Sequence, residues 1–217
     1  MEIKVIERVL GANDMVAGEL RELFKQRKIK VLNIMGTPGA GKTSVVERTI
    51  RAIGADWRVA VIEGDIATSL DAEKLAKLNI PVVQINTGGA CHLDASMIKS
   101  ATQQLDLGKI DLLIIENVGN LVCPAEFDLG EDKKILVSSV AEGDDKVQKY
   151  PLMFRTADAI ILNKIDLSPA VEFNNVNFKL CLSDLNPHAP LFEISCKTGE
   201  NIEQWTSWLI DNVLNQT

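Results

Sequence analysis

The sequence predicts an α/β fold in which a mostly parallel sheet carries helices on both faces. Short runs of Val, Ile and Leu recur along the chain, and longer amphipathic stretches follow them. Alternation of this kind is typical of βαβ units, and the apolar runs suit strands buried on both faces. Because no linker, repeat or low-complexity tract interrupts the pattern, we interpret residues 1–217 as a single domain.

The expected elements follow one another along the chain. A helical region at about residues 3–27 precedes the repeating pattern, and Gly11 or the "GAND" stretch is a candidate interruption within it. The last stretch is amphipathic, and its Trp205, Trp208 and Leu209 are expected to face the core. The expected strands are 30–35, 58–64, 81–86, 111–117, 134–140, 159–164 and 190–195.

The composition restricts the classes of function. The chain has 23 Lys and Arg against 30 Asp and Glu, and the resulting net charge of -7 disfavours binding to nucleic-acid phosphates. No apolar run approaches the ~20 residues of a membrane span, and the N-terminus lacks a signal-peptide core. Four widely spaced cysteines fit free thiols better than a disulfide framework. We therefore expect a cytoplasmic protein that binds neither nucleic acid nor a membrane.

The stretch "GTPGAGKT" at residues 36–43 fits the phosphate-loop pattern. Its glycines let backbone N–H groups turn toward phosphate oxygens, its lysine adds a cation, and its threonine offers a hydroxyl to Mg²⁺. The flanking strand and helix disfavour the alternative of a merely glycine-rich turn. The expected phosphate-binding residues are Gly36, Gly39, Ala40, Gly41, Lys42, Thr43 and Ser44.

The stretch "NKID" at residues 163–166 resembles the guanine-specificity motif of GTP-binding proteins. The Asp166 carboxylate can accept from the N1–H and the 2-amino group of guanine, whereas adenine lacks the second donor. "SCKTG" at 195–199 follows the next strand in the manner of a second base-contacting loop, in which Cys196 acts through its backbone. GTP and GDP are the expected nucleotides, and the expected base-contacting residues are Asn163, Lys164, Asp166, Ser195, Cys196 and Lys197.

Carboxylates at strand ends are candidates for binding magnesium beside the phosphate loop. Asp65 follows the second strand, Asp71 lies six residues further on, and Glu116 ends the fourth strand. Typical GTPases carry Asp-x-x-Gly where this chain has Glu116, and Asp71 has the alternative role of a helix cap. The expected Mg²⁺ ligands are Thr43, Asp65, Asp71 and Glu116, and the expected catalytic residues are Lys42, Thr43, Asp65 and Glu116.

The stretch "GGACHLDAS" places Cys91 and His92 after the third strand, and Cys123 follows the fourth strand. Because parallel strands end at one edge of a sheet, these side chains are expected near one another and near the γ-phosphate. Thiolate and imidazole suit Zn²⁺, Ni²⁺ or copper. Three ligands are fewer than the four of a closed structural zinc site, so either the thiols are structural or a second subunit completes a shared site.

Taken together, these segments resemble the hydrogenase nickel-incorporation GTPases, the family of the maturation factor HypB. The resemblance covers roughly residues 30–205, and "NTGGACHLDASMI" and "ENVGNLVCPAEFDLGE" are its most distinctive parts. It implies a P-loop NTPase fold of the SIMIBI-like GTPase type and nickel delivery to the active site of [NiFe]-hydrogenase. It also implies a homodimer that forms with GTP, with Cys91, His92 and Cys123 binding nickel, or zinc, at the interface.

The chain also departs from this family. No cysteine precedes Cys91 and no histidine precedes His92, so the nickel-binding N-terminal motifs of some members are missing. The resemblance therefore implies reliance on the interface site and on a HypA-like nickel metallochaperone, with the hydrogenase large subunit as recipient. Turnover is expected to be slow, because no arginine finger or water-positioning glutamine can be assigned. A urease nickel-insertion relative, a P-loop small-molecule kinase and a non-hydrolysing metal-binding module remain alternatives.

Overall fold

The computed structural model describes residues 9–65 and 70–216. Within them seven strands form one sheet in the order β3-β2-β4-β1-β5-β6-β7, and all neighbouring strands are parallel. This confirms the predicted α/β class, and each strand lies within two residues of its expected range. The strands are β1 (Lys30–Gly36), β2 (Val59–Asp65), β3 (Val82–Asn86), β4 (Leu112–Glu116), β5 (Lys133–Ser139), β6 (Ala159–Asn163) and β7 (Leu191–Glu193).

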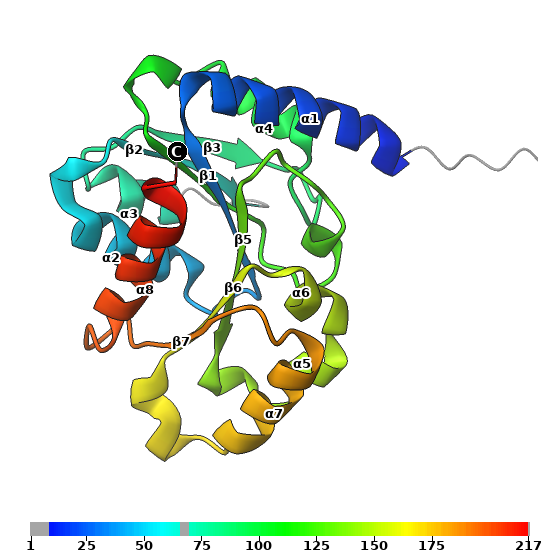
Figure 1. The fold of residues 1–217 in the computed structure, drawn as a ribbon, viewed down its shortest axis with the longest axis vertical. Coiled ribbons are helices and arrows are strands. Elements are labelled where there is room, and N and C mark those ends of the chain that lie inside the picture. The colour runs from blue at the N-terminus through cyan, green and yellow to red at the C-terminus, as the bar shows by residue number, and fades with distance from the viewer. Residues whose placement is uncertain (1–8, 66–69, 217) are drawn as a thin grey trace, which may run out of the picture.

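Helices cover both faces of the sheet, because successive side chains of a strand point to opposite sides. Leu32 and Ile34 of β1 pack in one cluster with α2 and α8, whereas Val31 packs in a second cluster with α1 and α4. A third cluster joins β5 and β6 to α6 and α7. Figure 1 shows α2 and α8 on one side of the sheet and α5, α6 and α7 on the other. The helices are α1 (Val9–Arg27), α2 (Lys42–Ile53), α3 (Leu70–Ala76), α4 (Ala95–Thr102), α5 (Lys146–Lys149), α6 (Pro151–Thr156), α7 (Asn175–Leu185) and α8 (Ile202–Leu209).

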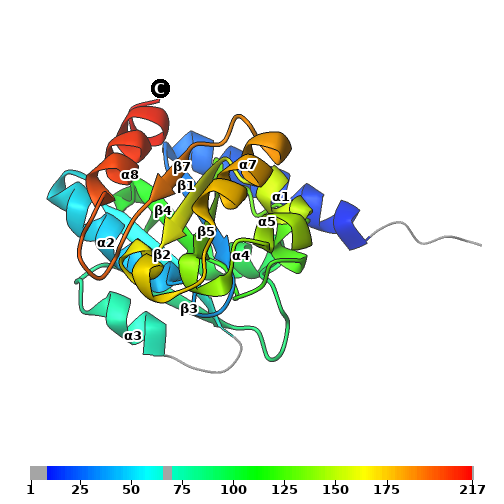
Figure 2. The same cartoon turned by 90° about the horizontal axis from the view of Figure 1, so that it is seen from below.

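The N-terminal helix is continuous where an interruption was predicted. α1 runs through Gly11 without a break, so that expectation is wrong, and residues 3–8 of the predicted helical region lie outside the described residues. Leu20 and Phe24 are buried against the sheet, and tertiary packing of this kind outweighs the weak helix propensity of one exposed glycine. Figure 2 shows the start of α1, in dark blue, projecting beyond the other elements.

The observed burial differs from the expected burial at the β3 edge of the sheet and in the C-terminal helix. The central strands are buried, but the side chains of the edge strand β3 are mostly half-buried. In α8, Trp205 and Leu209 are buried as expected, whereas Trp208 is half-buried and stacks on Trp205 with ring centroids 5.6 Å apart. Among the described residues, no helix is long and apolar enough to cross a membrane.

Candidate nucleotide-binding and metal site

The phosphate loop joins β1 to α2 and depends on glycine at the position just before the helix. Gly41, immediately before α2, has φ of 98°, a left-handed conformation that favours glycine. A Cβ at this position would lie 2.4 Å from the Asn163 side-chain nitrogen, so only a glycine lets the two loops approach this closely. The N-terminus of α2, with its free backbone N–H groups, forms part of the wall of a cavity beside the loop.

A cavity of about 420 Å³ lies beside this loop, at the carboxyl ends of β1, β2 and β4. Lys42 is 8% exposed, and its ammonium donates to the backbone carbonyls of Gly36 (3.4 Å) and Thr37 (3.2 Å). Burial lowers the pKa of Lys42, although nearby carboxylates oppose that effect. The residues lining the cavity include Gly39, Gly41, Lys42, Thr43, Ser44, Asp65, Asp71 and Glu116 from the predicted set. Gly36 and Ala40, also predicted to bind phosphate, do not line it, and Ala40 is fully buried.

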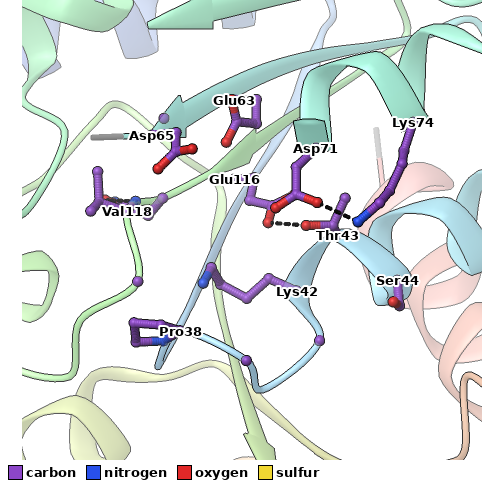
Figure 3. Close-up of a pocket in the computed structure, with 15 residues that line it drawn as sticks. Pro38, Lys42, Thr43, Ser44, Glu63, Asp65, Asp71, Lys74, Glu116 and Val118 are labelled. Atoms are coloured by element: carbon purple, nitrogen blue, oxygen red, sulfur yellow. Dashed lines mark hydrogen bonds and ion pairs between the residues drawn. The ribbon is translucent and has the colours of Figure 1, made fainter. Parts of the chain in front are cut away.

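The predicted magnesium ligands surround one end of this cavity (Figure 3). The Thr43 hydroxyl donates to Oε1 of Glu116 at 2.7 Å, whereas Oε2 of Glu116 is buried without a hydrogen-bond partner among the described residues. Burial raises the pKa of Glu116 to about 7, despite the opposing effects of Lys42 and Thr43. Asp71 lies in the first turn of α3 and forms an ion pair with Lys74 at 2.7 Å, so it is not the residue that caps this helix.

Glu63 is a cavity residue that the sequence reasoning missed. It is 3% exposed, and its Oε2 is also buried without a hydrogen-bond partner among the described residues. Burial, reinforced by Glu116 and Asp65, raises the pKa of Glu63 to about 8. The sequence did contain a signal for Glu63, because it stands two residues before Asp65 in the same strand, β2, and residues i and i+2 of a strand share a face. Figure 3 shows Glu63, Asp65 and Glu116 gathered around the same space.

The donor set of this cavity fits a divalent cation. Two buried carboxylate oxygens have no hydrogen-bond partner within residues 9–65 and 70–216, and leaving such groups unpaired is costly unless a cation or a proton compensates them. Carboxylate and hydroxyl oxygens are hard ligands that suit Mg²⁺, and the cavity places them beside the phosphate loop. Thr43, Glu63, Asp65, Asp71 and Glu116 are therefore suited to hold Mg²⁺ directly or through water.

A second cavity of about 370 Å³ adjoins the first at Gly41 and Ser44. Asn163 ties its walls together, because its amide donates to the Ala40 carbonyl (3.0 Å) and its oxygen accepts from the Cys196 N–H (3.2 Å). The predicted base-contacting residues that line the cavity are Asn163, Lys164, Asp166, Cys196 and Lys197.

The Asp166 carboxylate in this cavity is held by the predicted Ser195, whose hydroxyl donates to it at 2.6 Å. Ser195 itself is fully buried and lies behind the cavity wall. Burial raises the pKa of the Cys196 thiol to about 11, so the thiol stays protonated. The backbone N–H of Cys196 is the group that binds the Asn163 side chain. Arg48, a residue not singled out from the sequence, donates to the carbonyls of Cys196 (2.7 Å) and Lys197 (3.2 Å) and fastens this loop to α2.

Cys91, His92 and Cys123 come together as the third part of the site. One potential ligand atom from each lies within 4.8 Å of the other two. The Cys91 and Cys123 sulfurs are 3.0 Å apart, and the Cys91 sulfur is 3.7 Å from Nδ1 of His92. Hydrogen bonding to the Cys91 thiol raises the pKa of Cys123. This spacing suits a soft or borderline metal ion, which would replace the thiol protons.

An irregular turn makes this arrangement possible. Gly88 and Gly89 have φ of 61° and 111°, so the chain after β3 leaves the regular geometry in which neighbouring side chains diverge. The His92 ring packs against Phe127, with ring centroids 3.9 Å apart, and this contact restricts the orientation of the imidazole. Cys123 begins a short 3₁₀ turn (Cys123–Ala125) after β4, so two sheet-edge loops supply the three side chains.

The fold and the two cavities define a P-loop nucleotide-binding protein with a Cys/His cluster at the same sheet edge. Residues 30–193 match the model of the "CobW/HypB/UreG, nucleotide-binding domain" family. The chain belongs to this family and, within it, to the HypB group.

Curated relatives and solved structures support this placement. The chain is 43% identical over 214 residues to the hydrogenase/urease maturation factor HypB of Helicobacter pylori (strain J99), covering 97% of this chain and 88% of the relative. It is 44% identical to the hydrogenase maturation factor HypB of Azotobacter vinelandii, covering 95% of this chain and 68% of the relative.

Among solved structures, HypB from Helicobacter pylori in complex with nickel has a TM-score of 0.88 at 43% identity, covering 93% of this chain and 94% of that one. HypB from Archaeoglobus fulgidus also has a TM-score of 0.88, at 40% identity, covering 94% and 99% of the two chains. The signal recognition particle receptor FtsY from Elizabethkingia anophelis is 17% identical, and its TM-score of 0.58 shows a shared fold alone.

Proposed function

We propose that this protein is a GTP-hydrolysing metallochaperone that delivers nickel to the active site of [NiFe]-hydrogenase during maturation. The observation that carries the proposal is the Cys91, His92 and Cys123 cluster beside the phosphate cavity of a HypB-group chain. The solved Helicobacter pylori relative is described in complex with nickel, and the curated relatives are named as maturation factors.

The nucleotide half of the proposal assigns GTP across the two adjoining cavities. Asp166 accepts from the guanine edge, while Lys42 and the phosphate-loop N–H groups bind the β- and γ-phosphates. Water attacks the γ-phosphorus, the bond to the β–γ bridging oxygen breaks, and GDP and phosphate leave. When bound, Mg²⁺ would neutralise part of the phosphate charge. This assignment is supported by the buried oxygens of Glu63 and Glu116 that have no hydrogen-bond partner in the part of the chain that the structure describes. We expect slow intrinsic turnover.

The metal half of the proposal assigns Cys91, His92 and Cys123 as ligands for nickel, for which zinc competes. Three ligands from one chain leave a coordination sphere incomplete, so a second copy of this chain supplies the rest in a homodimer favoured by GTP. A HypA-like metallochaperone is the proposed nickel donor, and the hydrogenase large subunit is the proposed recipient. The setting is a reducing cytoplasm, because sulfurs 3.0 Å apart must stay unoxidised to bind the ion.

The test measures oligomeric state and bound Ni²⁺ by light scattering and metal analysis, with GDP and with a non-hydrolysable GTP analogue. We expect a dimer holding one Ni²⁺ with the analogue, and loss of that Ni²⁺ in Cys123→Ser. Cys181→Ser is the matched control, because Cys181 lies on α7 away from the cluster. Unchanged Ni²⁺ binding by Cys123→Ser would refute the metal assignment. A parallel sample holds a non-hydrolysable ATP analogue, and dimerisation with it in preference to the GTP analogue would refute the nucleotide assignment.

A further inference from the structure

The segment 117–120 after β4 lies between the phosphate loop and the Cys/His cluster. On the side of the phosphate loop, Gly119 packs so closely on Pro38 that an added Cβ would lie 2.7 Å from the proline Cγ. The backbone N–H of Asn120 donates to the Gly36 carbonyl at 3.0 Å, forming an isolated antiparallel bridge at the end of β1. A shift of the phosphate loop would therefore displace residues 119 and 120.

The side chain of Asn120 binds in the opposite direction, toward the metal cluster. Its amide donates to the Cys91 carbonyl at 3.3 Å, and its oxygen accepts from the N–H of Val122, which precedes Cys123, at 2.8 Å. One residue thus contacts the backbone of both loops that carry the thiols, while its own backbone is bonded to β1.

The carbonyl that binds Asn120 also has a nucleotide-sensitive partner. Gly36 O accepts both from the Asn120 N–H and from the ammonium of Lys42, at 3.4 Å. A phosphate in the adjoining cavity competes for that ammonium, because a charged oxygen is a stronger acceptor than a carbonyl. When Lys42 turns to phosphate, the Gly36 carbonyl loses the ammonium and keeps the shorter bond from the Asn120 N–H, so this link between the phosphate loop and Asn120 strengthens.

Asn117 holds the same metal loop but differs in its surroundings. Its oxygen accepts from the Leu93 N–H at 3.1 Å, and its amide donates to Asn33 within a fully buried polar network. No bond from its side chain to the phosphate loop occurs among the described residues. Asn117 also lines the phosphate cavity, and its N–H donates to the Ile34 carbonyl of β1 at 2.9 Å, but it is buried, whereas Asn120 is half-buried and is bonded to Gly36 of the phosphate loop itself.

We propose that Asn120 is a positioning residue that couples phosphate binding to metal affinity, by linking Gly36 of the phosphate loop to the loops of Cys91 and Cys123. The inference rests on the proposed function, since it requires both GTP and nickel to bind. Coupling of this kind is reciprocal: the factor by which the nucleotide changes Ni²⁺ affinity equals the factor by which Ni²⁺ changes nucleotide affinity.

The experiment compares wild type with Asn120→Ala and Asn120→Asp. Aspartate can still accept from the Val122 N–H but cannot donate to the Cys91 carbonyl, and its charge affects Ni²⁺ affinity in both nucleotide states. Asn86→Ala is the matched control, because the Asn86 side chain accepts from the Gly88 N–H within the same loop as Cys91. Ni²⁺ affinity is measured by calorimetry with Mg-GDP and with a Mg-bound non-hydrolysable GTP analogue, and unfolding midpoints check the fold.

We expect the ratio of the two Ni²⁺ affinities to be about fivefold or more in wild type and in Asn86→Ala, and within about twofold of unity in both Asn120 variants. If Asn120→Ala fails to fold, Asn120→Asp decides the question. A wild-type ratio of one would overturn the nucleotide–metal coupling and this inference together. A wild-type ratio that persists in the Asn120 variants would overturn the assignment to Asn120 alone and leave the proposed function standing.

Discussion

Glu63 and Glu116 show what two neighbouring strands can offer to a cation. Glu116 is buried at the end of β4 and Glu63 is buried two residues before the end of β2, and each carries one carboxylate oxygen without a hydrogen-bond partner among the described residues. β2 and β4 are neighbours with Glu63 opposite Glu116, so the Glu116 carboxylate, in addition to burial, opposes the ionisation of Glu63. Such a pair holds protons unusually strongly until a divalent cation replaces them.

The raised pKa of Glu63 predicts how stability changes with pH. In the unfolded chain this carboxyl loses its proton near 4.5, whereas in the folded protein it keeps the proton up to about 8. The folded state therefore binds more protons between these limits, and the free energy of unfolding falls as the pH rises through them. Glu63→Gln should remove the part of that decline that Glu63 causes, leaving the part that comes from the raised pKa of Glu116, and should stabilise the magnesium-free protein at pH 8 by about 4 kcal/mol.

Urea unfolding of the chelator-treated protein at several pH values checks this prediction. Glu22→Gln, an exposed position on α1, serves as the control and should keep the wild-type slope. Equal slopes for Glu63→Gln and wild type would contradict the argument.

At the scale of elements, α1 is bonded to both loops of the metal cluster. The Asn13 side chain donates to the Asp128 carbonyl (2.8 Å), at the end of the Cys123 loop, and accepts from the Ala95 N–H (2.9 Å), just beyond His92. The Arg21 guanidinium adds an ion pair with the Asp128 carboxylate at 2.7 Å. A helix outside the repeating βαβ pattern thus sets the position of the two loops.

Asn13→Ala should destabilise the protein by about 2 kcal/mol, because it leaves a buried backbone donor and a carbonyl without partners. Gly11→Ala, on the same helix, should instead stabilise it by about 0.5 kcal/mol or more, since a Cβ there meets open space. Denaturant unfolding of the two variants measures both effects. Equal stabilities of Asn13→Ala and wild type would show that α1 does not anchor these loops.

For the whole molecule, the nucleotide cavities connect the two halves of the sheet. One cavity lies at β2, β4 and β1, the other lies at β6 and the loop after β7, and both share Gly41 and Ser44. A ligand that fills both cavities stabilises the two halves together. Binding to the folded state alone raises the free energy of unfolding by about 2.7 kcal/mol at one hundred times the Kd.

Mg-GDP at saturating concentration should therefore raise the thermal unfolding midpoint, and Mg-ADP at the same concentration should raise it much less. Asp166→Ala should abolish this difference, because it removes the acceptor for the second guanine donor. Differential scanning calorimetry of the two proteins with each nucleotide measures the effect. Equal stabilisation by ADP and GDP in wild type would favour the kinase alternative.

The sequence by itself determined those features that rest on local pattern. Alternating apolar runs placed the strands within two residues, and the phosphate-loop and "NKID" stretches lie at the expected strand ends. Because parallel strands end at one edge, the sequence also predicted that Cys91, His92 and Cys123 would meet, and their ligand atoms do lie within 4.8 Å of one another. The roles of these residues in binding remain predictions.

Only the tertiary structure decided what depends on contacts between distant segments. The sheet order places Glu63 opposite Glu116, and it brings Asn120 against Gly36 and Cys91. It also decided that α1 continues through Gly11, where packing outweighs local propensity. The physical reason is that strand and helix patterns report which face of an element is buried, whereas burial of a charge or a link between two loops depends on which elements become neighbours.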